Sequence, residues 1–205
     1  DNNVPKTSDR QDKFEGTGGG FSPDSDRTRS GQFEMDCAQQ NFQPTQRRTK
    51  MSGKIENKLK ELGIELPDAP NPVANYQPYV MSGSFIFLSG QVTIWNGEMR
   101  YKGKIGRDLT VDQGYKAARM CGLNLIAQVR SACNGDLDRV KRVVKLGAFV
   151  NCVKDFKEHP NVVNGVSDLM AEVFGDAGRC TRTNAGVPSL PLGFAVEIDG
   201  VFEIK

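Results

Sequence analysis

Apolar residues are spread unevenly along the chain, and their spacing changes from one segment to the next. In residues 1–50, Val4 is almost the only aliphatic residue, while Gly, Ser, Asp, Gln and Arg dominate. Such a segment cannot bury enough apolar surface to offset the entropy that it loses on ordering. We therefore expect residues 1–50 to be a disordered extension and residues 51–205 to form the folded domain.

The folded part opens with apolar residues at helical spacing. Ile55, Leu59 and Leu62 recur at steps of four and three, which predicts a short amphipathic helix, and the glycine that follows is a natural stop. Three prolines within residues 67–72 then enforce an extended connector. Residues 51–70 are thus expected to be an N-terminal helix and its connector.

Two short β-forming runs come next and indicate a hairpin. Residues 76–82 lead into a turn at Gly83, and residues 85–92 are almost wholly apolar and too short for a helix. Because the pair Asn96-Gly97 is typical of a tight turn, residues 98–101 are expected to form a third, more exposed strand.

The longest predicted helix begins at Thr110, because Thr at the N-cap with Gln113 three residues later has the capping-box pattern. A long strand is expected over residues 140–150 and a second helix over residues 161–174, with Pro160 suited to its first turn. The first of these helices carries one stripe of apolar and small residues that would lie on a sheet: Tyr115, Ala118, Gly122, Leu125, Val129 and Ala132.

Two last extended runs lie within residues 180–199, joined by a loop bracketed by prolines. The order becomes β-β-β-α-β-α-β-β, which predicts an α+β fold with two helices packed on one face of a mixed β-sheet. The final run alternates only loosely, as strands do when both faces are largely covered, so an ionised Glu197 needs a partner or water. Arg182 is the nearest candidate.

Charge argues against two classes of partner. Residues 1–50 hold eight basic and eight acidic side chains, so the whole excess of 27 Lys and Arg over 25 Asp and Glu falls on the remainder as a net +2. That balance gives no basic surface for nucleic acid, and no apolar run is long enough to cross a membrane. The eight acidic residues also oppose a transit peptide, and Met51-Ser52-Gly53 is typical of a natural start, so we expect a cytoplasmic protein.

Cysteine usage indicates reduced thiols. The count is odd, no Cys-x-x-Cys pair occurs, and His159, expected in an exposed turn before a proline, is the single histidine. Neither a disulfide framework nor a zinc site is indicated, and buried thiols in a cytoplasmic protein are the simplest interpretation. The five are Cys37, Cys121, Cys133, Cys152 and Cys180.

The segment TRTNAGVPSLPLGFAVEI, residues 181–198, resembles the C-terminal signature of the YjgF/RidA imine deaminases, also called endoribonuclease L-PSP. Other blocks are similar to the same family: PYV…FLSGQV, QGYKAARMCGLNL, VNCVKDF and VNGVSDLMAEVF. The resemblance covers about residues 71–205 and implies a chorismate-mutase-like fold. It also implies a homotrimer with each pocket between two subunits, and no cofactor or metal.

The resemblance assigns roles to five residues. Arg182 matches the arginine that binds the substrate carboxylate, and Glu197 matches the glutamate that positions or activates water. Tyr79, Ser89 and Asn164 match polar residues that line the pocket. The implied reaction is hydrolysis of 2-imino or enamine acids to a 2-keto acid and ammonium.

The residue types suit that chemistry. A guanidinium binds a planar carboxylate through two hydrogen bonds and stays charged, and a carboxylate can act as general base toward water. Alternatives remain open. Arg182 and Glu197 could form an ion pair at a subunit interface. Asn184 stands where many family members carry a cysteine, which favours a trimer that binds carboxylate metabolites without catalysis. An endoribonuclease fits less well, because aromatic residues amount to 8% and no basic face is indicated.

Overall fold

The structure is a computed structural model that describes residues 53–70 and 75–205. Residues 1–50, predicted to be a disordered extension, lie outside the described part. Three short 3₁₀ turns occur at Leu137–Arg139 (η1), Gly175–Gly178 (η2) and Pro191–Gly193 (η3). The helices and strands, in chain order, are α1 (Lys54–Glu61), β1 (Tyr79–Ser82), β2 (Phe85–Val92), β3 (Ile94–Trp95), β4 (Glu98–Met99), α2 (Val111–Ala132), β5 (Val140–Asn151), α3 (His159–Phe174), β6 (Thr181–Val187) and β7 (Val196–Ile204).

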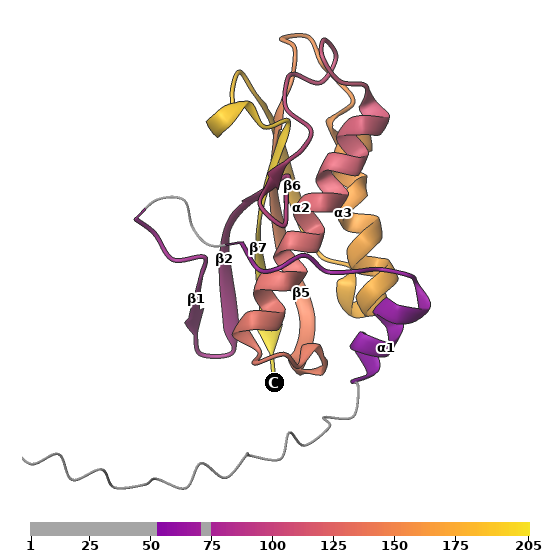
Figure 1. The fold of residues 1–205 in the computed structure, drawn as a ribbon, viewed down its shortest axis with the longest axis vertical. Helices are drawn as coiled ribbons and strands as arrows, with labels where there is room; N and C mark the ends of the chain where they lie inside the picture. The colour runs from indigo at the N-terminus through magenta and orange to yellow at the C-terminus, as the bar shows by residue number, and fades with distance from the viewer. Residues whose placement is uncertain (1–52, 71–74) are drawn as a thin grey trace, which may run out of the picture. The chain divides into compact units, whose positions relative to one another are not determined.

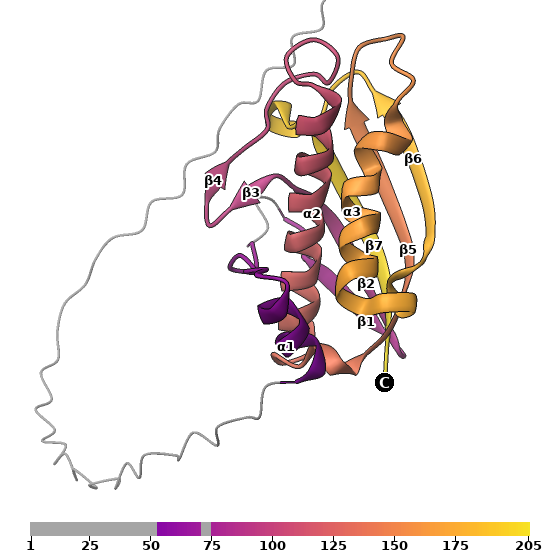
Figure 2. The ribbon, with the colours of Figure 1, turned by 90° about the vertical axis from the view of Figure 1, so that its right-hand side faces the viewer.

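Five strands form one mixed sheet in the order β1-β2-β7-β5-β6, in which only β5 and β6 run parallel. Helices α2 and α3 lie side by side on one face of this sheet (Figures 1 and 2). The predicted α+β architecture with a mixed sheet is therefore confirmed. The capping box at Thr110 is also present, with its hydroxyl accepting from the Gln113 N–H.

The predicted strand order differs at two places. The run expected as a third strand contributes only β4, which pairs with β3 in a separate two-stranded ribbon. Asn96 and Gly97 have φ angles of 48° and 86°, so the turn closes at once and returns the chain onto β3 instead of β2. The element order also left out the short N-terminal helix that the spacing of Ile55, Leu59 and Leu62 predicts; it is present as α1 and packs near the ends of α2 and α3 rather than on the sheet (Figure 2).

Close packing between α2 and α3 explains the small residues of the predicted stripe. A Cβ at Gly122 would lie 2.8 Å from a Leu169 methyl, and a Cβ at Gly165 would lie 2.0 Å from the Tyr115 carbonyl oxygen. The expectation that the whole stripe lies on the sheet is therefore wrong, because part of it faces α3. Between Ala117 and Val129, α2 is buried almost all round.

The second face of the sheet is not covered by any described residue. Along β7, Val196, Ile198 and Phe202 point to the helices, while the intervening side chains are only partly buried. Phe87 on β2 is 47% exposed, and Phe149 on β5 is 41% exposed. Phe87 and Phe149 lie on the two strands that flank β7, and together with Phe85 on β2 they expose apolar surface of the kind that marks an interface. We call it the open face.

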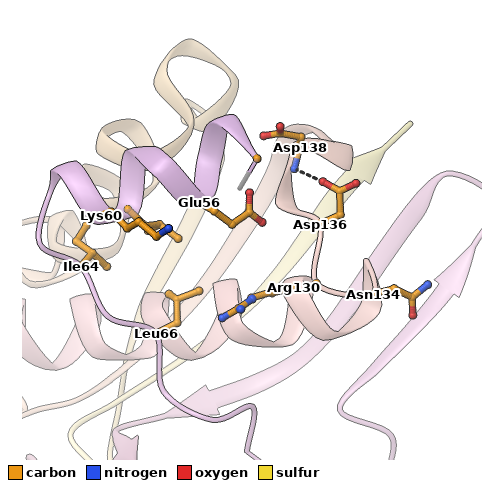
Figure 3. Close-up of a pocket in the computed structure, with 11 residues that line it drawn as sticks. Glu56, Lys60, Ile64, Leu66, Arg130, Asn134, Asp136 and Asp138 are labelled. Carbon is orange, nitrogen blue, oxygen red and sulfur yellow. Dashed lines mark hydrogen bonds between the residues drawn. The ribbon is translucent and has the colours of Figure 1, made fainter. Parts of the chain in front are cut away.

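Helix α1 and the 3₁₀ turn η1 cap each other, because a carboxylate of each accepts hydrogen bonds from backbone N–H groups of the other. The Asp138 carboxylate accepts hydrogen bonds from the N–H groups of Lys54 (2.7 Å) and Ile55 (2.9 Å), at the start of α1. In return, Glu56 Oε1 accepts from the Leu137 N–H at 2.9 Å. These side chains border a cavity of about 690 Å³ between α1 and the end of α2 (Figure 3). The carboxylates therefore satisfy N–H groups that a helix cannot satisfy itself.

Four cysteines fall in the described part, and all are free. Cys121, Cys133 and Cys152 are buried and Cys180 is partly buried, in agreement with the prediction of reduced thiols. None of the helices in residues 53–70 and 75–205 combines the length and the apolar character needed for a membrane span.

We expect Asp138→Asn to loosen α1, because a neutral amide is a weaker acceptor at a helix N-terminus. Desolvation raises the pKa of Asp138, but its hydrogen bonds from Ile55 and Lys54 outweigh this and leave the pKa below its ordinary value. The carboxylate thus stabilises the fold above the pKa that it has in the unfolded chain. This contribution is lost as the pH falls through the lower, folded pKa.

Thermal melts should show a loss of about 0.5–2 kcal/mol at neutral pH for Asp138→Asn, with a flatter acid dependence. Asp176→Asn is the matched control, because its carboxylate is fully exposed and lies 3.5 Å from the Arg179 Nε. Equal stability of the two variants across the acid range would contradict the role of Asp138.

Candidate functional site

Arg182 lies on β6 with its guanidinium turned toward α3. Its Nη1 donates to Asn164 Oδ1 and to Ser167 Oγ, each at 2.9 Å. No carboxylate of the described residues lies within ion-pair distance of Arg182. The Arg182 Nε and Nη2 groups donate no hydrogen bond to any described residue. A half-buried guanidinium held only by neutral oxygens keeps both its charge and free donors for a planar anion.

The structure thus joins two of the predicted residues, Arg182 and Asn164, and adds Ser167, which sequence reasoning missed. Asn164 and Ser167 are three residues apart on α3 and so lie on one face of the helix. That spacing was the available signal. Only the position of β6 beside this face reveals that both side chains hold the same arginine.

Glu197 is the second residue of β7, and its side chain occupies the space above Gly90. A Cβ built on Gly90 would lie 2.1 Å from Glu197 Oε1, so the carboxylate fits there because position 90 has no side chain. Burial raises the pKa of Glu197, and the nearby Asp199 raises it further. Asp199 occupies the equivalent space above Gly147, and burial raises its pKa too, with Lys145 opposing.

Arg182 and Glu197 lie on opposite faces of the sheet. Arg182 is the register partner of Leu146, which is fully buried under the helices. Glu197 is the partner of Phe149, on the open face. Residues directly opposite each other share a face, and Leu146 and Phe149 are an odd number of positions apart. The expectation that Arg182 is the nearest partner of Glu197 is therefore wrong within one chain.

Tyr79 lies on the other edge strand of the sheet, β1, and Ser89 lies on the adjacent strand β2. The Ser89 hydroxyl donates to the Gln77 carbonyl at 2.7 Å, which ties β2 to the segment that leads into β1. Ser89 precedes Gly90 at a β-bulge, where the register between β2 and β7 shifts. Tyr79 pairs with Leu88 and packs against the core, at the start of edge strand β1.

The five predicted residues are therefore spread across the sheet. Arg182 and Asn164 lie at the β6 edge, whereas Tyr79 lies on β1, four strand spacings away, or about 19 Å at ~4.8 Å per spacing. Ser89 and Glu197 lie between them, the latter on the open face. One chain alone does not bring the five residues together.

Asn184 lies two residues after Arg182, on the same face of β6, and is half-buried. Nothing in residues 53–70 and 75–205 groups three His, Cys, Asp or Glu side chains as a metal site.

The comparisons with known proteins place this arrangement in a family. Residues 56–199 match the family model described as YjgF/chorismate mutase-like, putative endoribonuclease. Protein TCP17 of Trypanosoma cruzi is 46% identical over 155 residues, which cover 75% of this chain and 96% of that protein.

Two solved structures have the same fold at high identity. Protein Atu1372 of Agrobacterium tumefaciens is 44% identical, with a TM-score of 0.69 over 74% of this chain and 92% of that one. A putative endoribonuclease of Shewanella oneidensis is 38% identical, with a TM-score of 0.71 over 73% of this chain and 99% of that one. With its sheet, its helices and its C-terminal Arg182–Glu197 segment matched in this way, the chain belongs to the YjgF/RidA family.

Proposed function

We propose that the protein is a cofactor-independent hydrolase that deaminates reactive 2-imino and enamine acids, acting as a cytoplasmic homotrimer with sites between subunits. The observation that carries this proposal is Arg182, a half-buried cation held by Asn164 and Ser167, with no carboxylate of the described part of the chain at ion-pair distance. Free thiols at the four described cysteines support a reducing compartment.

The chemistry follows from the charges of the two groups. Arg182 binds the carboxylate of the imino acid and fixes the adjacent C=N carbon in place. Glu197 of the adjacent subunit takes a proton from water as the oxygen adds to that carbon. Proton transfer to nitrogen then releases ammonia and leaves the keto acid. The raised pKa of Glu197 brings this carboxylate closer to the working pH of a general base.

A site between subunits is supported by the separation of the residues. Arg182 is on edge strand β6, while Tyr79 and Ser89 are on or beside the opposite edge. A closed ring of identical chains sets one edge of each sheet beside the other edge of its neighbour. Phe87, Phe149 and other side chains of the open face provide the apolar surface for such an assembly.

The second candidate is a trimer that binds carboxylate metabolites without hydrolysing them. Asn184, beside Arg182 on β6, favours it, because an amide can hydrogen-bond a ligand but supplies no thiol. The two functions share the anion site and differ in turnover. Ammonia release from enzymatically generated 2-iminobutanoate, with and without the protein, separates them.

Arg182→Ala should lower ammonia release at least tenfold, because a hydrogen bond to a charged group contributes about 1.5–3 kcal/mol. Arg182→Lys should restore little of the lost activity, since an ammonium cannot form two parallel hydrogen bonds to a planar carboxylate as a guanidinium does. Arg179→Ala is the control, because Arg179 is an exposed residue paired with Asp176. An assembled Arg182→Ala protein with wild-type ammonia release would disprove the proposed site.

Glu197→Gln should lower turnover by about 10²–10⁴-fold and remove the acid limb of the pH profile. The base must be ionised to accept a proton, and an ordinary glutamate has a pKa of about 4.3. Because the pKa of Glu197 is raised, the acid limb should lie at higher pH than an ordinary glutamate would give. Asp199→Asn, two residues away on the same face, is the matched control: it should keep an acid limb, moved to lower pH because Asp199 no longer raises the pKa of Glu197. If Glu197→Gln keeps both the rate and the limb, Glu197 is not the base.

Phe87→Asp should dissociate the trimer, because it places a charge in an apolar interface. Met99→Asp is the matched control: Met99 is 49% exposed, against 47% for Phe87, but lies on the β3–β4 ribbon away from the open face. Light scattering at micromolar concentration measures the mass. A monomeric wild-type protein would exclude the assembly.

A further inference from the structure

A second cavity of about 740 Å³ lies beyond the ends of β5 and β6, beside the start of α3. It is lined by the end of β6 with the following Pro188, by the loop before α2, and by the β5–α3 connection. Two groups of chemical interest meet there. One is a pair of reactive side chains, Cys152 and His159, and the other is a set of cations, Lys104, Arg107 and Lys154.

Cys152 and His159 form a thiol–imidazole pair. Cys152 Sγ lies 3.5 Å from His159 Nε2, within hydrogen-bonding distance for sulfur. The imidazole packs edge-on against the Phe156 ring, with centroids 5.0 Å apart, which restrains its orientation. Cys152 is 8% exposed.

Gly186 on β6 leaves the space that this pair occupies. A Cβ at position 186 would lie 2.4 Å from His159 Nε2 and 2.9 Å from Cys152 Sγ. The φ of Gly186 is not in the left-handed region, so its backbone does not demand a glycine. What position 186 provides is room beside the thiol and the imidazole.

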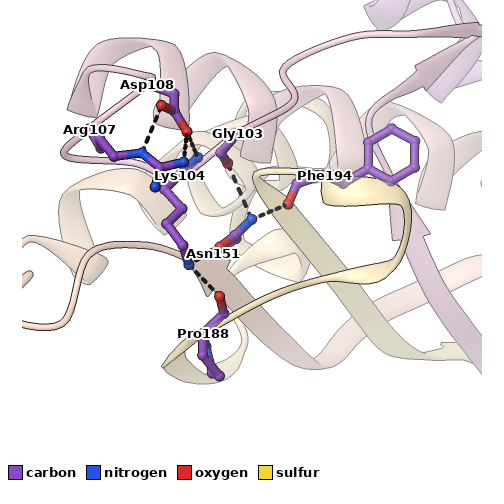
Figure 4. Close-up of polar contacts among 7 residues, drawn as sticks. All are labelled: Gly103, Lys104, Arg107, Asp108, Asn151, Pro188 and Phe194. Carbon is purple, nitrogen blue, oxygen red and sulfur yellow. Dashed lines mark hydrogen bonds and ion pairs between the residues drawn. The ribbon is translucent and has the colours of Figure 1, made fainter.

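Lys104 brings a positive charge to the cavity from the loop before α2. Its Nζ donates to Asn151 Oδ1 at 3.0 Å and to the Pro188 carbonyl (Figure 4). An ammonium has three N–H groups, so one donor remains for a ligand. Asn151 is itself fixed by donating to the Phe194 carbonyl at 3.1 Å, which makes the position of Lys104 well defined.

The charged side chains that line the cavity are all positive. Arg107 is neutralised by two hydrogen bonds to Asp108, both 2.8 Å. Lys154 makes no ion pair or hydrogen bond to any residue in the described part, and no carboxylate is among the residues that line the cavity. Lys104 and Lys154 therefore leave an uncompensated positive charge that attracts small anions. The N-terminus of α3, a 16-residue helix, adds to it.

We propose that this cavity is a second site, in which Cys152 reacts with small anionic electrophiles that Lys104 and Lys154 attract and His159 acts as the base. The ligand class is a carboxylate with a reactive carbon, such as an α-halo or α,β-unsaturated acid. The site is separate from the Arg182 site in its residues and does not rest on the function proposed above.

The covalent step needs no further reactant. The Cys152 thiol gives its proton to His159 Nε2, and the sulfur forms a bond to the electrophilic carbon. With an α-halo acid, the halide leaves with its bonding pair. With an unsaturated acid, the former C=C electron pair takes a proton from the imidazolium at the α-carbon. Because burial raises the pKa of Cys152, with Lys104 opposing, the thiol is protonated at rest and needs this base.

The test compares alkylation of the full chain by iodoacetate, an anion, with that by iodoacetamide, its neutral analogue. Mass spectrometry follows the rate at Cys152 in the folded protein and in urea. We expect the ratio of the iodoacetate rate to the iodoacetamide rate to be at least about tenfold higher in the folded protein, because a one-signed cleft concentrates anions. Equal ratios in the two states would overturn the proposal.

A charge variant tests the attraction separately. Lys154→Gln should lower the iodoacetate rate and leave the iodoacetamide rate unchanged. Lys157→Gln is the matched control, because Lys157 is an exposed lysine of the same connection that does not line the cavity. If both variants lose iodoacetate reactivity equally, the selectivity comes from general charge and the proposed site is wrong.

Two variants test the base. His159→Gln removes it, and Gly186→Ala places a methyl group against both reactive atoms. Each should slow both reagents at Cys152 by about tenfold or more. His159→Gln should keep a melting temperature near that of the wild type, whereas Gly186→Ala forces the pair to move and should lower the melting temperature. Folded variants that keep wild-type rates would overturn the role of His159.

Discussion

In the part of the chain that the structure describes, helices cover one face of the sheet only, and the placement of the candidate site residues depends on that asymmetry. Each strand alternates its side chains between the two faces, so every residue is assigned either to the helical core or to the open face. On β7 this assigns Val196, Ile198 and Phe202 to the core and Glu197 and Asp199 to the open face. Two carboxylates and several phenylalanines thus share a surface that no residue of 53–70 or 75–205 covers.

The same alternation divides the chemistry. Arg182 faces α3 because its partner on β5 is the buried Leu146, and Glu197 faces away because its partner is the exposed Phe149. Arg182 on β6 and Glu197 on β7 lie fifteen positions apart in the chain, and their placement on opposite faces keeps them from pairing with each other. Each therefore stays available to a ligand, which a direct ion pair between them would prevent.

The elements themselves were predictable from local patterns, since periodicity, capping and turn residues act over a few positions. The α2 capping box and the long strand β5 follow directly from such signals. Strand register is different, because it is set by contacts between segments far apart in the chain. For this reason the sequence could indicate Arg182 and Glu197 as important but could not show that they face opposite ways.

The Cys152–His159 pair was missed for a related reason. Helix α3 begins at His159, two residues before the predicted start, so the imidazole is not in an exposed turn but at the first turn of a helix. The parallel pairing of β5 with β6 and the return into α3 then place it against Cys152. A seven-residue spacing between a cysteine and a histidine carries no such information on its own.

The space above Gly90 has a consequence for how relatives of this chain are interpreted. The Glu197 carboxylate occupies the volume that a side chain at position 90 would need. The residue at position 90 therefore determines whether a glutamate at position 197 can adopt this orientation. A related sequence with a bulkier residue at 90 cannot keep the glutamate in this orientation, even if it retains both Arg182 and Glu197. Grouping family sequences by the presence of glycine at position 90, rather than by Arg182 and Glu197, would then separate chains that can hold the carboxylate in this geometry from chains that only have the same charged residues.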